Sequence, residues 1–155
     1  MDILPELDAE RAVLSAMLTD LQAVSAAIEL LDAECFRHAP HTIVFRALID
    51  CFDAEGDTDA AKVAEAASRL GQDTAWAYDV DFSDLVRDLV ADAVSSDTLP
   101  ANTQLLRSNV VRHDLAEVTD ILRSQAVTGK EEISSLIERI DRKLLHIAGK
   151  MEVCA

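Results

Sequence analysis

The sequence predicts an all-α protein, with a compact head of about five helices followed by a long antiparallel helical hairpin. Only four glycines and three prolines occur in 155 residues, so turn signals are few. Half of the residues are hydrophobic, and they recur at the three- and four-residue spacing that places them on one face of a helix. The chain length suits one core, and no low-complexity linker divides it. We therefore expect one domain, with the head in residues 1–98 and the hairpin in residues 99–150.

Capping and breaking residues divide the head into five expected helices. An Asp side chain accepts hydrogen bonds from the first N–H groups of a helix, whereas Gly ends a helix because it adopts the left-handed conformation easily. Pro suits the first turn, where its missing N–H is no loss. The expected segments are residues 9–19 after Asp8, a second helix opened by Asp20, a third that starts at Pro40 and stops at Gly56, a fourth that Asp57 or Asp59 caps and Gly71 ends, and residues 82–91.

Two long amphipathic segments follow, residues 100–125 and 130–147, joined by residues 126–129. So short a connection between long helices is typical of an antiparallel hairpin. The apolar stripes are wider than one partner helix covers, which indicates contact with another copy of the chain. The alternative is that the hairpin folds back on the head and buries its second face there. The residues expected at the interface between copies are Leu106, Val110, Val111, Leu115, Val118, Leu122, Ile133, Ile137, Ile140 and Leu144.

The charge balance argues against one class of partner. The chain has 29 Asp and Glu against 14 Lys and Arg, a net charge of −15. Because nucleic-acid binding draws on Lys and Arg, direct DNA binding by this chain is not expected. The acidic surface is either a solvated face or a docking face for a basic protein partner. No apolar run approaches the roughly 20 residues needed to cross a bilayer, and the N-terminus is unlike a signal peptide, so we expect a soluble cytoplasmic protein.

Two histidines are the strongest candidates for chemistry. His38 and His41 have the spacing His-x-x-His, which can place two imidazoles on one side of a helix. Here Pro40 places His38 before the helix and His41 in its first turn, and no third ligand lies at a suitable spacing. We interpret both histidines as architectural residues at the start of a helix. We expect no metal site.

The remaining motifs give no sign of catalysis or of a cofactor. Gly129-Lys130 resembles part of a phosphate loop, but Ser124 stands where that motif requires Gly and Glu131 where it requires Ser or Thr. No nucleophile with a base and no catalytic pair of carboxylates stands out. The three cysteines lack C-x-x-C spacing and are interpreted as inert thiols. They are Cys35, Cys51 and Cys154.

The order and spacing of several short motifs resemble the N-terminal domain of DnaB-type replicative DNA helicases. The similarity covers about residues 4–148. The matching motifs are Leu7-Asp8-Ala9-Glu10-Arg11-Ala12-Val13-Leu14, Glu34-x-Phe36, His41-x-x-x-Phe45-x-Ala47-Leu48, Gly56-Asp57-x-Asp59, Leu70-Gly71, Leu85-x-x-x-Leu89, Asn102 and Val110-Val111-Arg112. The resemblance implies that Phe36, His41 and Phe45 are a structural signature, with the phenylalanines in the core. One stretch departs from the family, since Trp76 and Tyr78 stand where a glycine pair is usual.

The resemblance also implies a function. In that family the hairpins pair between subunits, so that the N-terminal tier forms a collar on a hexameric ring. The collar binds primase or a helicase loader, whereas ATP hydrolysis belongs to a separate motor domain, which we do not expect in this chain. The leading hypothesis is therefore a non-catalytic assembly and docking module of a replicative helicase, self-associating as a dimer or hexamer within the primosome. The alternative is a free-standing adaptor or inhibitor of phage or plasmid type that mimics the collar to engage helicase or primase.

Overall fold

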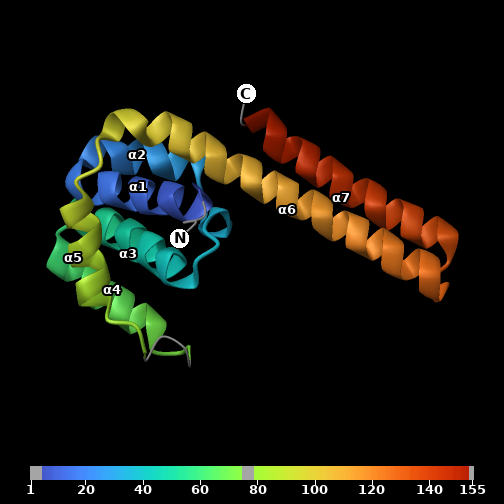
Figure 1. The fold of residues 1–155 in the computed structure, drawn as a ribbon, viewed down its shortest axis with the longest axis horizontal. Helices are drawn as coiled ribbons and strands as arrows, with labels where there is room; N and C mark the ends of the chain where they lie inside the picture. Colours follow the sequence, from blue (N-terminus) through green and yellow to red (C-terminus); the bar gives the residue numbers. More distant parts are fainter. Residues whose placement is uncertain (1–4, 75–78, 154–155) are drawn as a thin grey trace. The chain divides into compact units, whose positions relative to one another are not determined.

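A computed structural model describes residues 5–74 and 79–153, and every regular element in this part of the chain is helical, as predicted (Figure 1). The Trp76/Tyr78 connection and Cys154 lie outside the described residues. None of the described helices combines the length and apolar character that crossing a bilayer requires. The elements are α1 (Pro5–Thr19), α2 (Leu21–Leu30), the short 3-10 helix η1 (Ala33–Cys35), α3 (Ala39–Glu55), α4 (Ala60–Gly71), α5 (Phe82–Asp92), the 3-10 helix η3 (Ser96–Thr98), α6 (Leu99–Thr128) and α7 (Ile133–Val153).

The chain divides into two compact units, a head unit of residues 1–106 and a hairpin unit of residues 107–155. The expected boundary at residues 98 and 99 falls at the start of α6. The first two turns of this helix nevertheless belong to the head unit, where Leu99, Thr103 and Leu106 are buried. These three residues are four and three positions apart, so they lie on one face of the helix.

Helix α1 is the centre of the head unit and packs against α2, α3 and α5. Its residues Val13, Leu14 and Met17 are fully buried. Phe45 and Leu48 of α3 complete this apolar core, since both have no exposed surface. Helix α4 packs against α3 and α5. The helices of the head therefore share one core with α1 inside it.

Polar groups of α1 hold three loops of the head. The Glu10 carboxylate accepts hydrogen bonds from the backbone N–H groups of Arg37 and His38, ahead of α3. The Ser15 hydroxyl accepts one from the Val94 N–H at 3.1 Å, after α5. The carbonyl oxygen of Met17 accepts one from the Thr58 hydroxyl at 3.1 Å, before α4. Because Glu10, Ser15 and Thr58 are buried, each bond satisfies groups that water cannot reach.

Two caps are present as predicted, Asp20 and Asp59, and Asp81, which was not predicted, caps α5 in the same way. The side chains of Asp20, Asp59 and Asp81 accept hydrogen bonds from N–H groups in the first turns of α2, α4 and α5. Gly56 ends α3 in the left-handed conformation, with a φ of 71°. These boundaries depend on residues within one helical turn, which is why the sequence predicts them.

Three predicted boundaries are wrong. Helix α7 continues past residue 147, where its end was predicted, to Val153. Helix α1 begins at Pro5, so Asp8 lies in its first turn and does not cap it. The turn of the hairpin comprises residues 129–132, three positions later than predicted, because residues 126–128 continue α6. Gly129 ends that helix: it has a φ of 59°, and its N–H donates to the Gln125 carbonyl oxygen.

We expect Glu10→Ala to lower the free energy of unfolding by about 3 kcal/mol, because it leaves two loop N–H groups and the His41 ring without their acceptor in the core. Asp8→Ala is the control: Asp8 is an exposed residue of the same helix, and its loss should change stability by about 0.5 kcal/mol or less. Urea unfolding followed by circular dichroism measures both values. Equal losses for the two variants would contradict the role assigned to Glu10.

Ala93 caps α5 in the left-handed conformation, with φ 45° and ψ 44°. The left-handed conformation costs a residue with a Cβ atom about 1–2 kcal/mol, and glycine avoids this cost. The greater conformational entropy of glycine in the unfolded chain offsets part of that gain. Ala93→Gly should therefore raise the free energy of unfolding by about 0.5 kcal/mol. Ala91→Gly, at an exposed position inside α5, should lower it by about 0.5–1 kcal/mol. Thermal unfolding of both variants checks the opposite signs.

Candidate protein-interaction surfaces

His38 and His41 lie side by side at the start of α3, with ring centroids 4.6 Å apart. His41 is 2% exposed, and its Nδ1 atom lies 2.7 Å from Oε2 of Glu10, which is 1% exposed. The same carboxylate also accepts from two backbone N–H groups, so its oxygen atoms already have partners. Partial burial lowers the pKa of His38, and the neighbouring His41 lowers it further, against the opposing charge of Glu10. This geometry suits a structural contact that joins α1 to the start of α3.

The partner of His41 is the residue that sequence reasoning missed. Glu10 is separated from His41 by 31 positions, so no local pattern joins them. One signal was present: Glu10, Leu14 and Met17 share one face of α1, which puts a carboxylate in line with core residues. A carboxylate at such a position needs a buried partner. Phe36 and Phe45 are buried in the head core, with ring centroids 4.6 Å apart.

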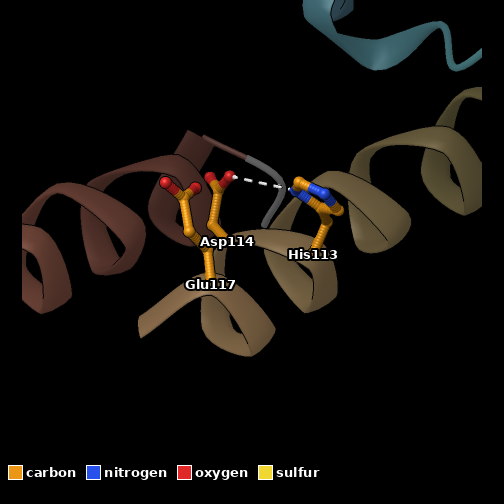
Figure 2. A group of neighbouring side chains, drawn as sticks. All are labelled: His113, Asp114 and Glu117. Carbon is orange, nitrogen blue, oxygen red and sulfur yellow. Dashed lines mark ion pairs between the residues drawn. The ribbon is translucent and has the colours of Figure 1, made fainter. Parts of the chain in front are cut away.

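A second group of possible ligands lies on α6 in the hairpin unit. Figure 2 shows His113, Asp114 and Glu117 there, with the two carboxylates side by side. The Lys150 ammonium of α7 is 2.6 Å from Oδ2 of Asp114, closer than the His113 ring at 4.0 Å from the other oxygen. A divalent cation would have to displace that ammonium. The cluster therefore suits an ion pair that joins α6 to α7 better than it suits a metal.

The seam between α6 and α7 is apolar. These helices run antiparallel and side by side (Figure 1). Val118, Ile140 and Ile147 are buried between them, and three further side chains are packed against this cluster. The further side chains are Val111, Ile121 and Leu136. The hairpin unit thus has a small core of its own.

The structure places the residues expected at an interface between copies in three different environments. Leu106 is buried in the head unit. Val118 and Ile140 are buried in the seam, while Val110 and Val111 are half-buried. The remaining five are exposed on the hairpin, and we call them the outer stripe: Leu115, Leu122, Ile133, Ile137 and Leu144.

Every residue of the outer stripe lies four positions after or three positions before a seam residue. Leu122 follows Val118 by four, for example, and Ile137 precedes Ile140 by three. Either step turns a side chain about 40–60° from the seam, in the same rotational sense. Because α6 and α7 are antiparallel, equal rotations bring both halves of the stripe to the same side of the hairpin. The hairpin therefore carries one continuous aliphatic face that its own seam does not cover.

Comparison with known proteins gives a consistent result. The family model described as "DnaB-like helicase N terminal domain" matches residues 4–108. The replicative DNA helicase DnaB of Rhodothermus marinus is 23% identical over 142 residues, which are 92% of this chain and 15% of that protein. The replicative DNA helicase DnaB of Treponema pallidum (strain Nichols) is 28% identical over 150 residues, 95% of this chain and 33% of that protein.

The fold comparison agrees. The crystal structure of the N-terminal domain of DnaB helicase from Mycobacterium tuberculosis matches with a TM-score of 0.79 and 18% identity, covering 90% of this chain and 96% of that one. At this identity the likeness shows the fold. The chain spans well under half of the length of the two curated relatives, and the family match covers more than half of the chain. The chain belongs to the family of DnaB-like helicase N-terminal domains.

Proposed function

We propose that this chain is a non-catalytic assembly and docking module of a replicative DNA helicase, in which hairpins pair through the outer stripe to build the N-terminal collar. The observation that carries the proposal is the outer stripe itself. Five aliphatic side chains stay exposed on a hairpin that has already filled its own seam. Contiguous exposed apolar surface of this kind marks an interaction site.

The charge distribution favours hairpins as the place where copies meet. Residues 1–106 contain 21 Asp and Glu against six Lys and Arg, whereas residues 107–155 contain eight of each. The net charge of −15 therefore belongs to the head unit, and the hairpin unit is neutral. Two neutral hairpins can approach without repulsion. Burying five aliphatic side chains from each copy stabilises the pair by roughly 1 kcal/mol or more per side chain before association costs.

The proposed partner of the assembled collar is a protein, either a primase or a helicase loader. A surface built across neighbouring hairpins exists only after the hairpins have paired, so partner binding should depend on assembly. The acidic head opposes DNA binding, because the phosphate backbone is a polyanion and repulsion acts within a Debye length of about 8 Å at physiological salt. The module itself contributes no catalysis, and ATP hydrolysis is left to the motor of the helicase.

Self-association tests the role of the outer stripe. We expect sedimentation equilibrium to show a dimer at about 100 µM, and Ile137→Asp to abolish it because a charge cannot be buried in an aliphatic contact. Leu145→Asp is the matched control. Leu145 is 71% exposed against 61% for Ile137, and it lies about 140° around α7 from Ile140, outside the stripe. A wild-type monomer at this concentration, or equal dissociation by both variants, would refute pairing through the stripe.

Partner choice is tested by calorimetric titration with the C-terminal domain of the cognate primase, alongside a fluorescent single-stranded oligonucleotide at the same salt concentration. We expect binding to the primase domain only, and its loss in Ile137→Asp. Lys130→Glu, a charge reversal in the hairpin turn, should weaken binding less because exposed charges contribute about 1 kcal/mol or less. Tight binding to the oligonucleotide with none to the primase domain would reject the docking module.

A further inference from the structure

A groove of about 630 Å³ lies between α3 and α4 on the head unit. Four of its lining residues are apolar, namely Cys51 and Ala54 of α3 with Ala66 and Leu70 of α4. Leu70 is 40% exposed, although it follows the buried Val63 and Ala67 on the same helix. Burial raises the pKa of the Cys51 thiol, and the carboxylates of Glu55 and Asp50 raise it further, so this side chain stays neutral at physiological pH. The floor of the groove is therefore uncharged.

The charged residues that line the groove are three carboxylates and two cations, a net charge of −1. Asp50 and Glu55 of α3 and Glu65 of α4 line it together with Lys62 and Arg69. The Lys62 ammonium hydrogen-bonds to the Glu55 carboxylate and lies 3.8 Å from that of Asp57. The hydrogen bond to Glu55 and the charges of Asp57 and Glu55 raise the pKa of Lys62. Its positive charge is thus already matched within the chain.

The surroundings add to the negative charge. Residues 50–70 carry six carboxylates and two cations. The groove therefore combines an aliphatic floor with a net negative border, which is the complement of an amphipathic helix that has aliphatic side chains on one face and Lys or Arg on either side. Grooves between two packed helices bind such amphipathic helices, whose apolar side chains, three and four positions apart, enter the groove.

We propose that the groove between α3 and α4 is a docking site for a basic amphipathic helix of a partner protein. The proposal goes beyond collar assembly, because all of its lining residues belong to one head unit and no second copy is required. Nucleic acids and nucleotides carry the wrong charge for this border. A second copy of this chain is a poor occupant, since its head has the same acidic surface.

The probe is a fluorescein-labelled synthetic helix of about 18 residues, long enough to be partly helical alone, with leucines on one face and lysines beside them. A second peptide replaces every lysine with glutamate. Both are titrated by fluorescence anisotropy with the full chain carrying Ile137→Asp, so that binding is measured apart from self-association. We expect the lysine peptide to bind at least about ten-fold more tightly than the glutamate peptide, as complementary charge requires.

Two matched pairs of variants locate the site. Glu65→Lys in the groove should weaken the lysine peptide about ten-fold, whereas Glu29→Lys on the exposed surface of α2 makes the same change in net charge and should weaken it less than about three-fold. Leu70→Ser should weaken it about five-fold, and Leu30→Ser, which alters a side chain of similar exposure at 38%, should have no effect. Circular dichroism confirms that each variant is folded.

Three outcomes would overturn the proposal. Equal effects of Glu65→Lys and Glu29→Lys would show that peptide affinity depends on the net charge of the chain and not on binding in the groove. Equal binding of the lysine and glutamate peptides would exclude a partner that is recognised by its basic side chains. The unsubstituted chain is titrated in parallel, and binding of the lysine peptide to it but not to the Ile137→Asp chain would place the site on paired hairpins. Whether the hairpins pair is measured separately by sedimentation, so failure of the groove proposal and failure of hairpin pairing are distinguishable.

Discussion

The head depends on one buried carboxylate. Glu10 joins α1, the centre of the core, to the loop that precedes α3, through two backbone N–H groups and the His41 ring. A buried carboxylate is tolerated only when its oxygen atoms have such partners. The Glu10 carboxylate fixes the loop that leads into α3. The residue at which α3 begins determines which of its side chains reach the core. Phe45 and Leu48 of the same helix are fully buried.

Sequence reasoning succeeded where the signal was local and failed where it was not. Helix ends in the head are set by contacts within one turn, so the helix order of the head was predictable. The residues that make these contacts include Asp20, Asp59 and Gly56. Glu10 and His41 are far apart in sequence, and only the fold makes them partners. The hairpin turn was misplaced because no residue before Gly129 interrupts α6. Residues 126–128 are compatible with either a turn or a helix, and continued hydrogen bonding along α6 decides in favour of the helix.

The candidate interface shows the limit of periodicity. Spacing identified the apolar residues of α6 and α7, but spacing alone does not say what covers each of them. Val118 and Ile140 are covered by the facing helix, and Leu106 by the head. Only a rotation of about 40–60° around each helix separates them from the outer stripe. The groove between α3 and α4 was not predicted, because each helix contributes one face on which apolar and charged side chains are mixed, and only the fold brings the two faces together.

The confinement of the net charge to the head reverses the usual effect of ionic strength on association. In a complex held by opposite charges, added salt weakens binding. Here the groups proposed to meet are aliphatic and the hairpin unit is neutral, while each neighbouring head carries a charge of −15. Salt screens the repulsion between heads and leaves the apolar contact in place. Raising the ionic strength should therefore strengthen pairing, and dilute buffer should act as the dissociating solvent.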